Sequence, residues 1–162
     1  MSRDIEAIPI TAEGFAHFGD LIEATESPDR LINEGLCGRF HDRARLDFGG
    51  GRAGISLFDA VPRDLPYELA LVERHPEGSQ AFVPMTEHPF LVTVCPDEDG
   101  APGTPRAFLT SPGQAINFHR GTWHGVLTPL YAPGLFAVVD RIGEGANLEE
   151  HRFATPWRIV RA

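Results

Sequence analysis

Cysteine is scarce in this sequence, and so are long apolar segments. Cys37 and Cys95 are the two cysteines, and residues 1–6 lack the apolar stretch of a secretory signal. No run approaches the roughly 18 consecutive apolar residues that a membrane-spanning helix requires. We therefore expect reduced thiols, a cytoplasmic location and no membrane partner.

Positive charge is also in short supply. The chain has 14 Lys and Arg residues against 23 Asp and Glu residues, which gives a formal net charge of −9. Proteins that bind nucleic acids usually neutralise phosphates with a basic patch or stripe, and this composition does not indicate one. We expect no nucleic-acid partner, and an anionic substrate would have to meet individually placed arginines.

Common catalytic and cofactor motifs are absent as well. The sequence contains no Gly-x-Ser-x-Gly nucleophile elbow, and no dinucleotide-type glycine pattern follows a predicted strand. Gly49, Gly50 and Gly51 predict a turn and not a phosphate loop, because no Lys-Ser/Thr pair follows them. We therefore expect no organic cofactor.

Glycine and proline, in contrast, are plentiful and divide the chain into short segments. There are 17 Gly and 14 Pro residues, while 42% hydrophobic residues and 11 Phe supply material for a core. This pattern predicts an all-β protein with a few short helices, folded as one domain over residues 1–162. About ten short strands favour a sandwich or a closed barrel. Jelly-roll barrels of the cupin kind, also called double-stranded β-helices, hold small ligands inside.

The first segments combine strand and helix signals. Glu6–Ile10 predicts an edge strand, because Pro9 cannot donate a hydrogen bond to a second neighbour. Thr11 can cap a short helix that runs to about Phe18. Further strands are predicted at residues 21–23, 53–58, 67–72, 80–84, 90–94, 106–109 and 114–118.

The second half of the chain predicts a central strand, an exposed loop and a C-terminal tail. Leu135–Val139 is the most continuous apolar run, so it predicts a central strand that delivers Asp140 and Arg141 at its end. Residues 97–105, rich in acidic residues, Gly and Pro, predict an exposed loop. We expect the tail, residues 147–162, to pack on the barrel or on another subunit.

Chemistry-bearing side chains are concentrated in residues 73–84 and 118–124. Glu73 and His75 are two apart on an extended segment and so share one face, and Gln80 re-enters the same space after a turn. Metal-binding cupins place a His, a second His two residues later, and a Glu four or five residues beyond. The sequence keeps this spacing, with Glu73 in the first His position and Gln80 in the Glu position.

The second segment supplies the fourth position of the cupin pattern. A Gly-x-x-His spacing, here Gly121 to His124, precedes the final His of that pattern. The four positions, Glu73, His75, Gln80 and His124, offer a carboxylate, two imidazoles and an amide. They could bind a divalent metal, with nickel consistent with the imidazoles, or form a metal-free acid/base site.

Four further residues are candidates for binding the substrate. An arginine that reaches inward could hold a carboxylate through a bidentate pair. His119 precedes the turn of the second segment and either contacts the substrate or supports that turn. The substrate-binding candidates are Arg74, His119, Arg120 and Arg141.

The same segments resemble a known family, the ureidoglycolate lyases of allantoin degradation, formerly called ureidoglycolate hydrolases. The resemblance rests on Glu73-Arg74-His75-Pro76-x-Gly78-x-Gln80-Ala81-Phe82-x-Pro84-Met85, on Phe118-His119-Arg120-Gly121-x-Trp123-His124 and on Asp140-Arg141. It extends to residues 15–23 and 39–42 and so covers most of the chain.

The resemblance implies a cupin-like barrel, usually a homodimer, that acts as a carbon–nitrogen lyase in purine degradation. It implies cleavage of (S)-ureidoglycolate to glyoxylate and urea, stimulated by nickel. His75 and His124 would be the main acid/base groups or metal ligands, with Glu73 and Gln80 beside them. Gly125 departs from the pattern, since members often carry a second His there, and that His is not essential here if the activity is retained.

Two other functions fit the same residues. One is a different cupin enzyme, a metal-dependent dioxygenase or isomerase acting on a small carboxylic acid. Tightly bound iron and oxygen consumption would favour it. The other is a non-catalytic cupin that binds a small molecule in the same pocket, without turnover.

Overall fold

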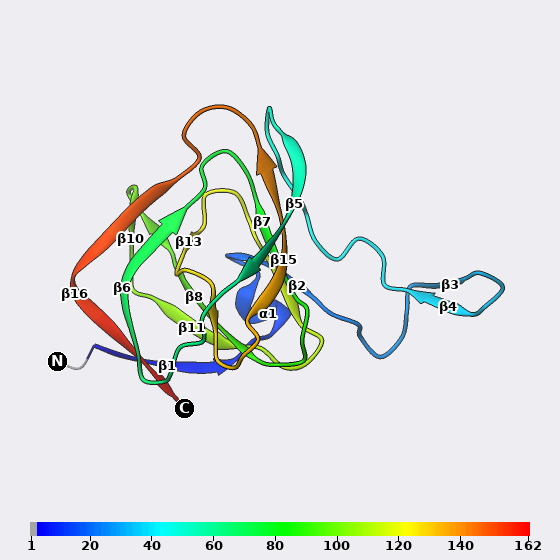
Figure 1. The fold of residues 1–162 in the computed structure, drawn as a ribbon, viewed down its shortest axis with the longest axis horizontal. Coiled ribbons are helices and arrows are strands. Elements are labelled where there is room, and N and C mark those ends of the chain that lie inside the picture. The colour runs from blue at the N-terminus through cyan, green and yellow to red at the C-terminus, as the bar shows by residue number, and fades with distance from the viewer. Residues whose placement is uncertain (1–2) are drawn as a thin grey trace.

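Almost all regular structure in the computed structural model, which describes residues 3–162, is β (Figure 1). The larger sheet closes on itself, because β11 pairs with β8 as well as with β1 and so completes a barrel of six strands. In order across the sheet, the strands are β11 (Arg106–Leu109), β1 (Asp4–Pro9), β16 (Glu149–Arg161), β6 (Tyr67–Arg74), β13 (Trp123–His124), β8 (Phe90–Cys95) and β14 (Thr128–Pro129).

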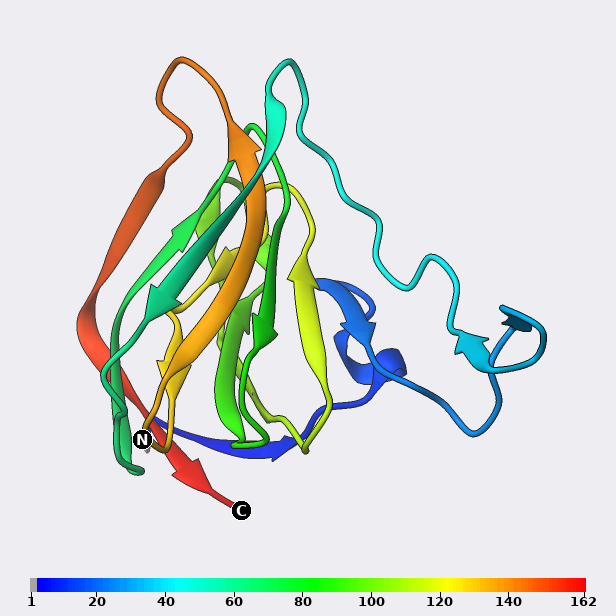
Figure 2. The same cartoon turned by 45° about the vertical axis from the view of Figure 1, so that its right-hand side comes forward.

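A second sheet of five strands lies beside the barrel (Figure 2). Its order is β2 (Gly19–Ile22), β12 (Ala115–Phe118), β7 (Gln80–Pro84), β15 (Leu135–Ile142) and β5 (Arg52–Asp59). The remaining elements are the short helix α1 (Ala12–Phe15) and two small hairpins, β3 (Arg30–Ile32) with β4 (Cys37–Arg39) and β9 (Asp97–Glu98) with β10 (Ala101–Pro102).

The buried apolar side chains form two clusters, one for each layer of the fold. The first, rich in Phe, includes residues of β8 and β11 together with residues of β2, β7, β12 and β15, so it fills the space between barrel and sheet. The second includes Leu69 and Val72 of β6, Trp123 of β13 and Ile159 of β16, and it fills the barrel itself. Because β8 and β11 contribute residues to both clusters, the two faces of these strands look into different cores.

The sequence-based prediction of an all-β, cupin-like fold is confirmed. The structure contains the predicted strands at 53–58, 67–72, 80–84, 90–94 and 106–109, each lengthened by at most two residues at either end. Leu135–Val139 is central as predicted, because β15 pairs with β5 on one side and with β7 on the other.

Two local predictions were wrong. β1 is not an edge strand, since it lies between β11 and β16. Pro9 is tolerated because pairing with β16 ends at Ala7, before a donor at Pro9 would be needed. The helix capped by Thr11, whose hydroxyl accepts from the N–H of Gly14 at 3.0 Å, ends at Phe15 and does not reach Phe18.

The structure also shows where the C-terminal tail and the acidic segment lie. The tail forms β16, the longest strand, which pairs with β6 and β1 and therefore packs on the barrel. The acidic segment, residues 97–105, is mostly exposed as predicted, but it contains the β9–β10 hairpin. Within residues 3–162, no helix is both long and apolar enough to cross a membrane.

Asp97 forms polar contacts with Trp123 and Arg74 at one end of the barrel. Because these contacts favour its ionised form, we expect them to make the stability of the protein depend on pH in the acid range. The Trp123 indole donates to Oδ1 of Asp97 at 2.9 Å, and Arg74 Nη1 lies 2.8 Å from the same atom. The Trp123 hydrogen bond, followed by those from Gly100 and Arg74, holds the pKa of Asp97 below its ordinary value. A lowered pKa contributes stability above pH about 4 and loses it as pH falls through the folded-state pKa.

We therefore expect the urea midpoint of the parent protein to exceed that of Asp97→Asn at pH 7. The difference should shrink between pH 5 and pH 3, when the carboxyl group gains a proton. Urea unfolding followed by Trp fluorescence at each pH measures it. A difference that stays constant over this range would show that Asp97 does not act through its charge.

Candidate active site

The site begins where β6 ends, beside the two-residue strand β13. His124 of β13 is the direct cross-strand neighbour of Glu73 on β6, and His75 follows just beyond the end of β6. One ligand atom from each of Glu73, His75 and His124 lies within 4.8 Å of the other two. The structure therefore brings together residues from both of the segments that carried chemistry in the sequence.

Backbone carbonyls fix the two imidazoles in one tautomer. Nδ1 of His75 lies 2.9 Å from the carbonyl oxygen of Asn147, and Nδ1 of His124 lies 2.8 Å from that of Gly125. A carbonyl oxygen only accepts, so each Nδ1 carries the proton and each Nε2 presents a lone pair. Both Nε2 atoms are buried without a hydrogen-bond partner among the described residues.

His124 is the most deeply enclosed of the three. It is 1% exposed, and its ring stacks on Phe118 with centroids 4.2 Å apart and an interplanar angle of 7°. Desolvation, together with the neighbouring His75, lowers the pKa of His124 to about 3, although the hydrogen bond to Gly125 opposes the shift. The ring is therefore neutral at physiological pH and acts through its lone pair.

Glu73 is half-buried beside these rings. Burial raises the pKa of its carboxyl group, Glu150 raises it further, and His75 partly offsets the shift. Like a carboxylic acid in any poorly hydrated site, it takes up a proton more readily than an exposed glutamate. Glu73 is thus suited to carry a proton between two atoms of a bound molecule.

Gln80 enters the same layer from the opposite sheet, and its orientation is set by Asp140. The two residues are cross-strand neighbours on β7 and β15, and Gln80 Nε2 donates to Asp140 Oδ2 at 3.1 Å. An ionised carboxylate cannot donate, so the amide nitrogen must face Asp140 and the amide oxygen must face away. That oxygen, Oε1, is buried and has no partner within residues 3–162.

Asp140 is a site residue that the sequence reasoning did not select. The sequence places it at the end of a central strand and in the Asp140-Arg141 motif, but gives it no role in the site. The signal was the alternation along β15, where Phe136 and Val138 face the core between the sheets and Asp140 follows at the same period. A charged residue in register with two core residues marks a polar position that faces inward.

This set of donors fits a divalent metal ion. Within the described residues, the Nε2 atoms of His75 and His124 and the Oε1 of Gln80 are buried without a hydrogen-bond partner, and the Glu73 carboxylate lies in one group with the two imidazoles. Each imidazole donates its other nitrogen to a carbonyl, the arrangement that usually orients histidine ligands. Glu73, His75 and His124 could therefore hold an ion, with Gln80 as a further oxygen donor from the facing sheet.

Two of the predicted substrate-binding residues lie elsewhere. Arg74 occupies the other face of β6, where its guanidinium lies 4.4 Å from the centre of the Trp123 ring and pairs with Asp97 and Glu149. His119 lies outside the cup, with Nε2 3.0 Å from Asp20 Oδ2. The structure does not bring either side chain to the histidine pair.

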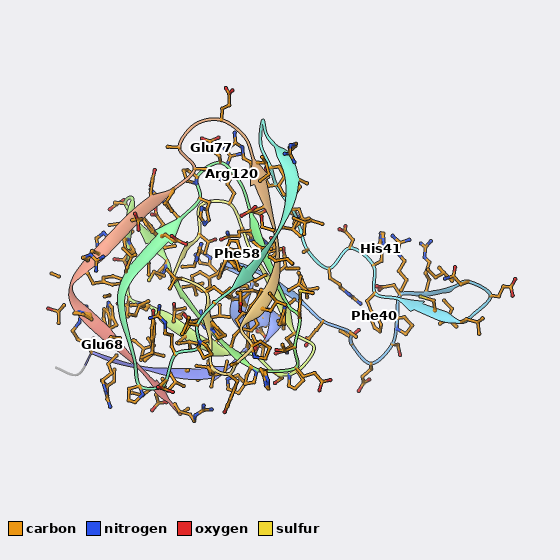
Figure 3. The ribbon with its side chains drawn as sticks, in the orientation of Figure 1. Phe40, His41, Phe58, Glu68, Glu77 and Arg120 are labelled. Carbon is orange, nitrogen blue, oxygen red and sulfur yellow. The ribbon has the colours of Figure 1, made fainter. Side chains whose placement is uncertain are left out.

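The other two arginines lie near the rim. Arg120 donates to the carbonyl of Pro76 at 2.6 Å and lies 3.5 Å from Glu77, with which it is labelled in Figure 3. Arg141 leaves the end of β15, donates to the carbonyl of Glu144 at 3.3 Å, and keeps a buried Nε without a partner among the described residues. Arg120 thus contacts the backbone of the residue after His75, and Arg141 directly follows Asp140.

Gly125 has a packing reason to lack a side chain. A Cβ at this position would collide with the hydroxyl of Thr93 and lie 3.1 Å from Leu69. The N–H of Gly125 donates to the Thr93 carbonyl at 2.9 Å, so its backbone is tied to β8. A second histidine after His124 would not fit this arrangement, and Gly125 contributes only the carbonyl that orients His124.

Asn147 connects its own loop to the segment that carries His75 and Glu77. Its side-chain Oδ1 accepts from the N–H of Glu77 at 2.7 Å, while its carbonyl accepts from His75. Asn147→Ala should loosen both links, lowering kcat/KM and metal affinity about 5- to 10-fold, as expected for one lost hydrogen bond. Asn147→Asp keeps an acceptor and serves as the control. Equal metal affinity in all three proteins, by calorimetry, would contradict this role.

Fold and site together define a cupin-like protein whose interior carries a two-histidine, carboxylate and amide centre. Comparison with known proteins gives the particular family. The sequence model of the family "Ureidoglycolate lyase" matches residues 2–160. The chain belongs to the ureidoglycolate lyase family.

Individual relatives agree along nearly the whole length. A ureidoglycolate lyase of Rhodobacter capsulatus is 64% identical over 152 residues, 93% of this chain and 94% of the relative. One from a Chelativorans species is 55% identical over 97% of this chain and 96% of its own. "Ureidoglycolate lyase 2" of Rhizobium meliloti is 50% identical over 93% and 94%.

Proposed function

We propose that this protein is a ureidoglycolate lyase that cleaves (S)-ureidoglycolate to glyoxylate and urea in purine degradation. The observation that carries the proposal is the enclosed group of Glu73, His75 and His124, whose imidazoles each present a free Nε2 lone pair. Membership of the family and near full-length relatives of that name support the substrate.

The reaction requires one proton to move from oxygen to nitrogen. Ureidoglycolate carries a hydroxyl and a ureido nitrogen on one carbon. As the carbon–nitrogen bond breaks, the hydroxyl loses its proton to form the aldehyde, and the departing nitrogen gains one to form urea. No net proton, nucleophile or redox cofactor is consumed. Positioned acid/base groups of this kind typically contribute about 10²–10⁴-fold in rate.

The site residues have two roles: one transfers the proton, and the others bind the substrate. Glu73, with its raised pKa, is the group we assign to take the hydroxyl proton and return it to the nitrogen. Three acceptor atoms remain for the substrate, namely the Nε2 atoms of His75 and His124 and the Oε1 of Gln80. They either accept hydrogen bonds from the substrate directly or would hold a metal ion that binds its polar atoms. The aldehyde carbon is thereby fixed between the two sheets.

The same residues would hold a divalent metal, for which we propose nickel, and no organic cofactor. The ligands would be His75, His124 and Glu73, with Gln80 completing the set. A bound ion would supply polarisation of the substrate hydroxyl and lower its pKa. Imidazole nitrogen is a ligand type that suits nickel, zinc, copper and iron alike, so the nickel assignment also rests on the family resemblance.

The carboxylate of the substrate needs a cationic partner at the rim. Of the four candidates named from the sequence, we propose Arg120 and Arg141 for this role, because both lie beside the loops that border the site. Arg74 lies on the other face of β6 and His119 lies outside the cup, so neither has a part in the proposal. We further propose that residues 1–162 act as one domain, in a cytoplasmic homodimer.

Turnover of the substrate tests the assignment directly. Purified protein, stripped with a chelator and reloaded with Ni²⁺, Mn²⁺, Co²⁺ or Zn²⁺, is mixed with (S)-ureidoglycolate. Equal amounts of glyoxylate and urea should form above the spontaneous background. Absence of urea above background with every metal would overturn the proposal, and oxygen consumption on a small acid would favour a dioxygenase instead.

A further inference from the structure

A segment that we call the arm, residues 24–46, leaves the body of the protein. Figures 1 and 2 show it running outward after β2, turning at the β3–β4 hairpin and returning toward β5. Its base is tied to the body: the N–H of Arg45 donates to Asp20 Oδ2 at 2.8 Å, and Asn117 Nδ2 donates to the Arg45 carbonyl at 3.1 Å. Beyond this base most arm residues are exposed, and among the described strands β3 and β4 pair only with each other.

The arm is poorly suited to stand alone. Leu31 is 64% exposed and Leu36 87% exposed, and Phe40, labelled in Figure 3, lies on the same outlying segment. Strands β3 and β4 have three residues each, and an isolated two-stranded hairpin is at best marginally stable in water. Arg30 lies directly opposite Arg39 across this hairpin, and like charges in that position repel.

A matching apolar surface lies on the outer side of the five-stranded sheet. Ile55 and Leu57 on β5 are 75% and 63% exposed, and Val83 and Met85 at the end of β7 are 38% and 54% exposed. Ala137 of β15 pairs with both Leu57 and Val83, so these side chains form one continuous surface. We call it the outer sheet face; the opposite side of the same strands carries the buried Phe-rich core.

Charge complements the apolar match. Asp59 ends β5 and Glu87 lies two residues after Met85, so both carboxylates flank the outer sheet face, and both are exposed. Among residues 3–162, neither forms an ion pair, and neither do Arg30 and Arg39 of the arm. An acidic partner near the hairpin would relieve the repulsion between the two arginines, and a second copy of this chain supplies one.

We propose that the arm of one copy lies across the outer sheet face of a second copy, and that the second arm does the same in return. In Figure 1 the arm leaves the body on the side where β5 and β15 lie. In a dimer with a two-fold axis the same pair of contacts forms twice, so each arm would meet the other copy's sheet. Leu31 and Leu36 then cover Ile55 and Leu57. The inference names the interface of the homodimer proposed above and does not depend on the reaction.

Sedimentation equilibrium tests the two halves of the interface separately. The parent should be a dimer at micromolar concentration. Leu31→Asp/Leu36→Asp and Ile55→Asp/Leu57→Asp should each weaken dimerisation about 100-fold or more, since each loses two buried apolar side chains. Ile8→Ser, which changes a half-exposed side chain on β1, is the control and should dimerise like the parent. Circular dichroism verifies that every variant is folded.

Cross-linking distinguishes an exchanged arm from other dimers. Cys37 lies in β4 and is exposed, whereas Cys95 is buried, so the native arm carries one accessible thiol. The native chain is mixed with a tagged Cys37→Ser/Ile55→Cys chain and treated with a flexible bismaleimide. A covalent heterodimer supports the proposal. A parent that remains monomeric overturns the dimer, and a dimer that persists when the arm is changed, without a heterodimer, overturns the role of the arm alone.

Discussion

His124→Ala is expected to lower kcat/KM for ureidoglycolate about 10²–10⁴-fold and to abolish tight binding of a divalent metal. The ring is 1% exposed and stacked on Phe118, so its removal leaves a cavity and takes away one of the two free Nε2 atoms. No other imidazole can replace it, because a side chain at Gly125 would collide with Thr93. Steady-state kinetics and metal titration by calorimetry measure the two effects.

His119→Ala is the matched control for this prediction. It also removes an imidazole from the second segment, but that ring pairs with Asp20 on the outside of the cup. We expect kcat/KM and metal affinity within about twofold of the parent, since surface ion pairs contribute little. If His119→Ala lost as much activity as His124→Ala, the site would have to be moved to the outer surface. Preserved turnover in His124→Ala would also contradict the assignment.

The parts of the site that were predictable obey local periodicity. Glu73 and His75 are two apart at the end of a strand, and Gln80 follows a turn, so their shared face could be inferred without coordinates. His124 was predicted from its spacing to Gly121. The structure adds that His124 and Glu73 are cross-strand neighbours, which joins the two segments directly.

The parts that escaped prediction depend on contacts between distant segments. The carbonyl of Asn147 orients His75 from 72 positions away in the sequence, and Asp140 orients Gln80 from 60 positions away. Alternation along β15 places Asp140 on the inward face, but the sequence does not indicate which distant residue either group contacts. The position of β1 between β11 and β16 is of the same kind, because Pro9 indicates an edge strand locally while the pairing on either side is staggered.

Arg74 illustrates the limit of motif-based assignment. Its place between Glu73 and His75 suggested a role in the site, yet alternation along β6 turns it to the opposite face, against Trp123 and Asp97. Glu73 and Arg74 therefore lie on opposite faces of β6 although they are neighbours in the sequence. One face of β6 carries chemistry, and the other closes the end of the barrel.

Exchanging the amide and carboxylate of Gln80 and Asp140 is the second prediction with a large expected effect. In Gln80→Glu, two carboxylates would face each other at the position of a 3.1 Å hydrogen bond. One of them must then take up a proton or turn away, and the acceptor that Gln80 presents to the site is no longer held in place. We expect kcat/KM to fall about 10- to 100-fold, as for the loss of a buried hydrogen bond at 1–3 kcal/mol.

The double change Gln80→Glu/Asp140→Asn restores a donor facing an acceptor, with the roles reversed. The amide of residue 140 would donate to the carboxylate at 80, whose second oxygen points where the Gln80 Oε1 did. We expect kcat/KM within about tenfold of the parent and a metal affinity at least as high, because a carboxylate binds divalent ions better than an amide. Kinetics and calorimetry on the parent, both single variants and the double variant form a closed cycle. Additive losses in the double variant would mean that Asp140 does not orient Gln80, and that the amide reaches the site without its help.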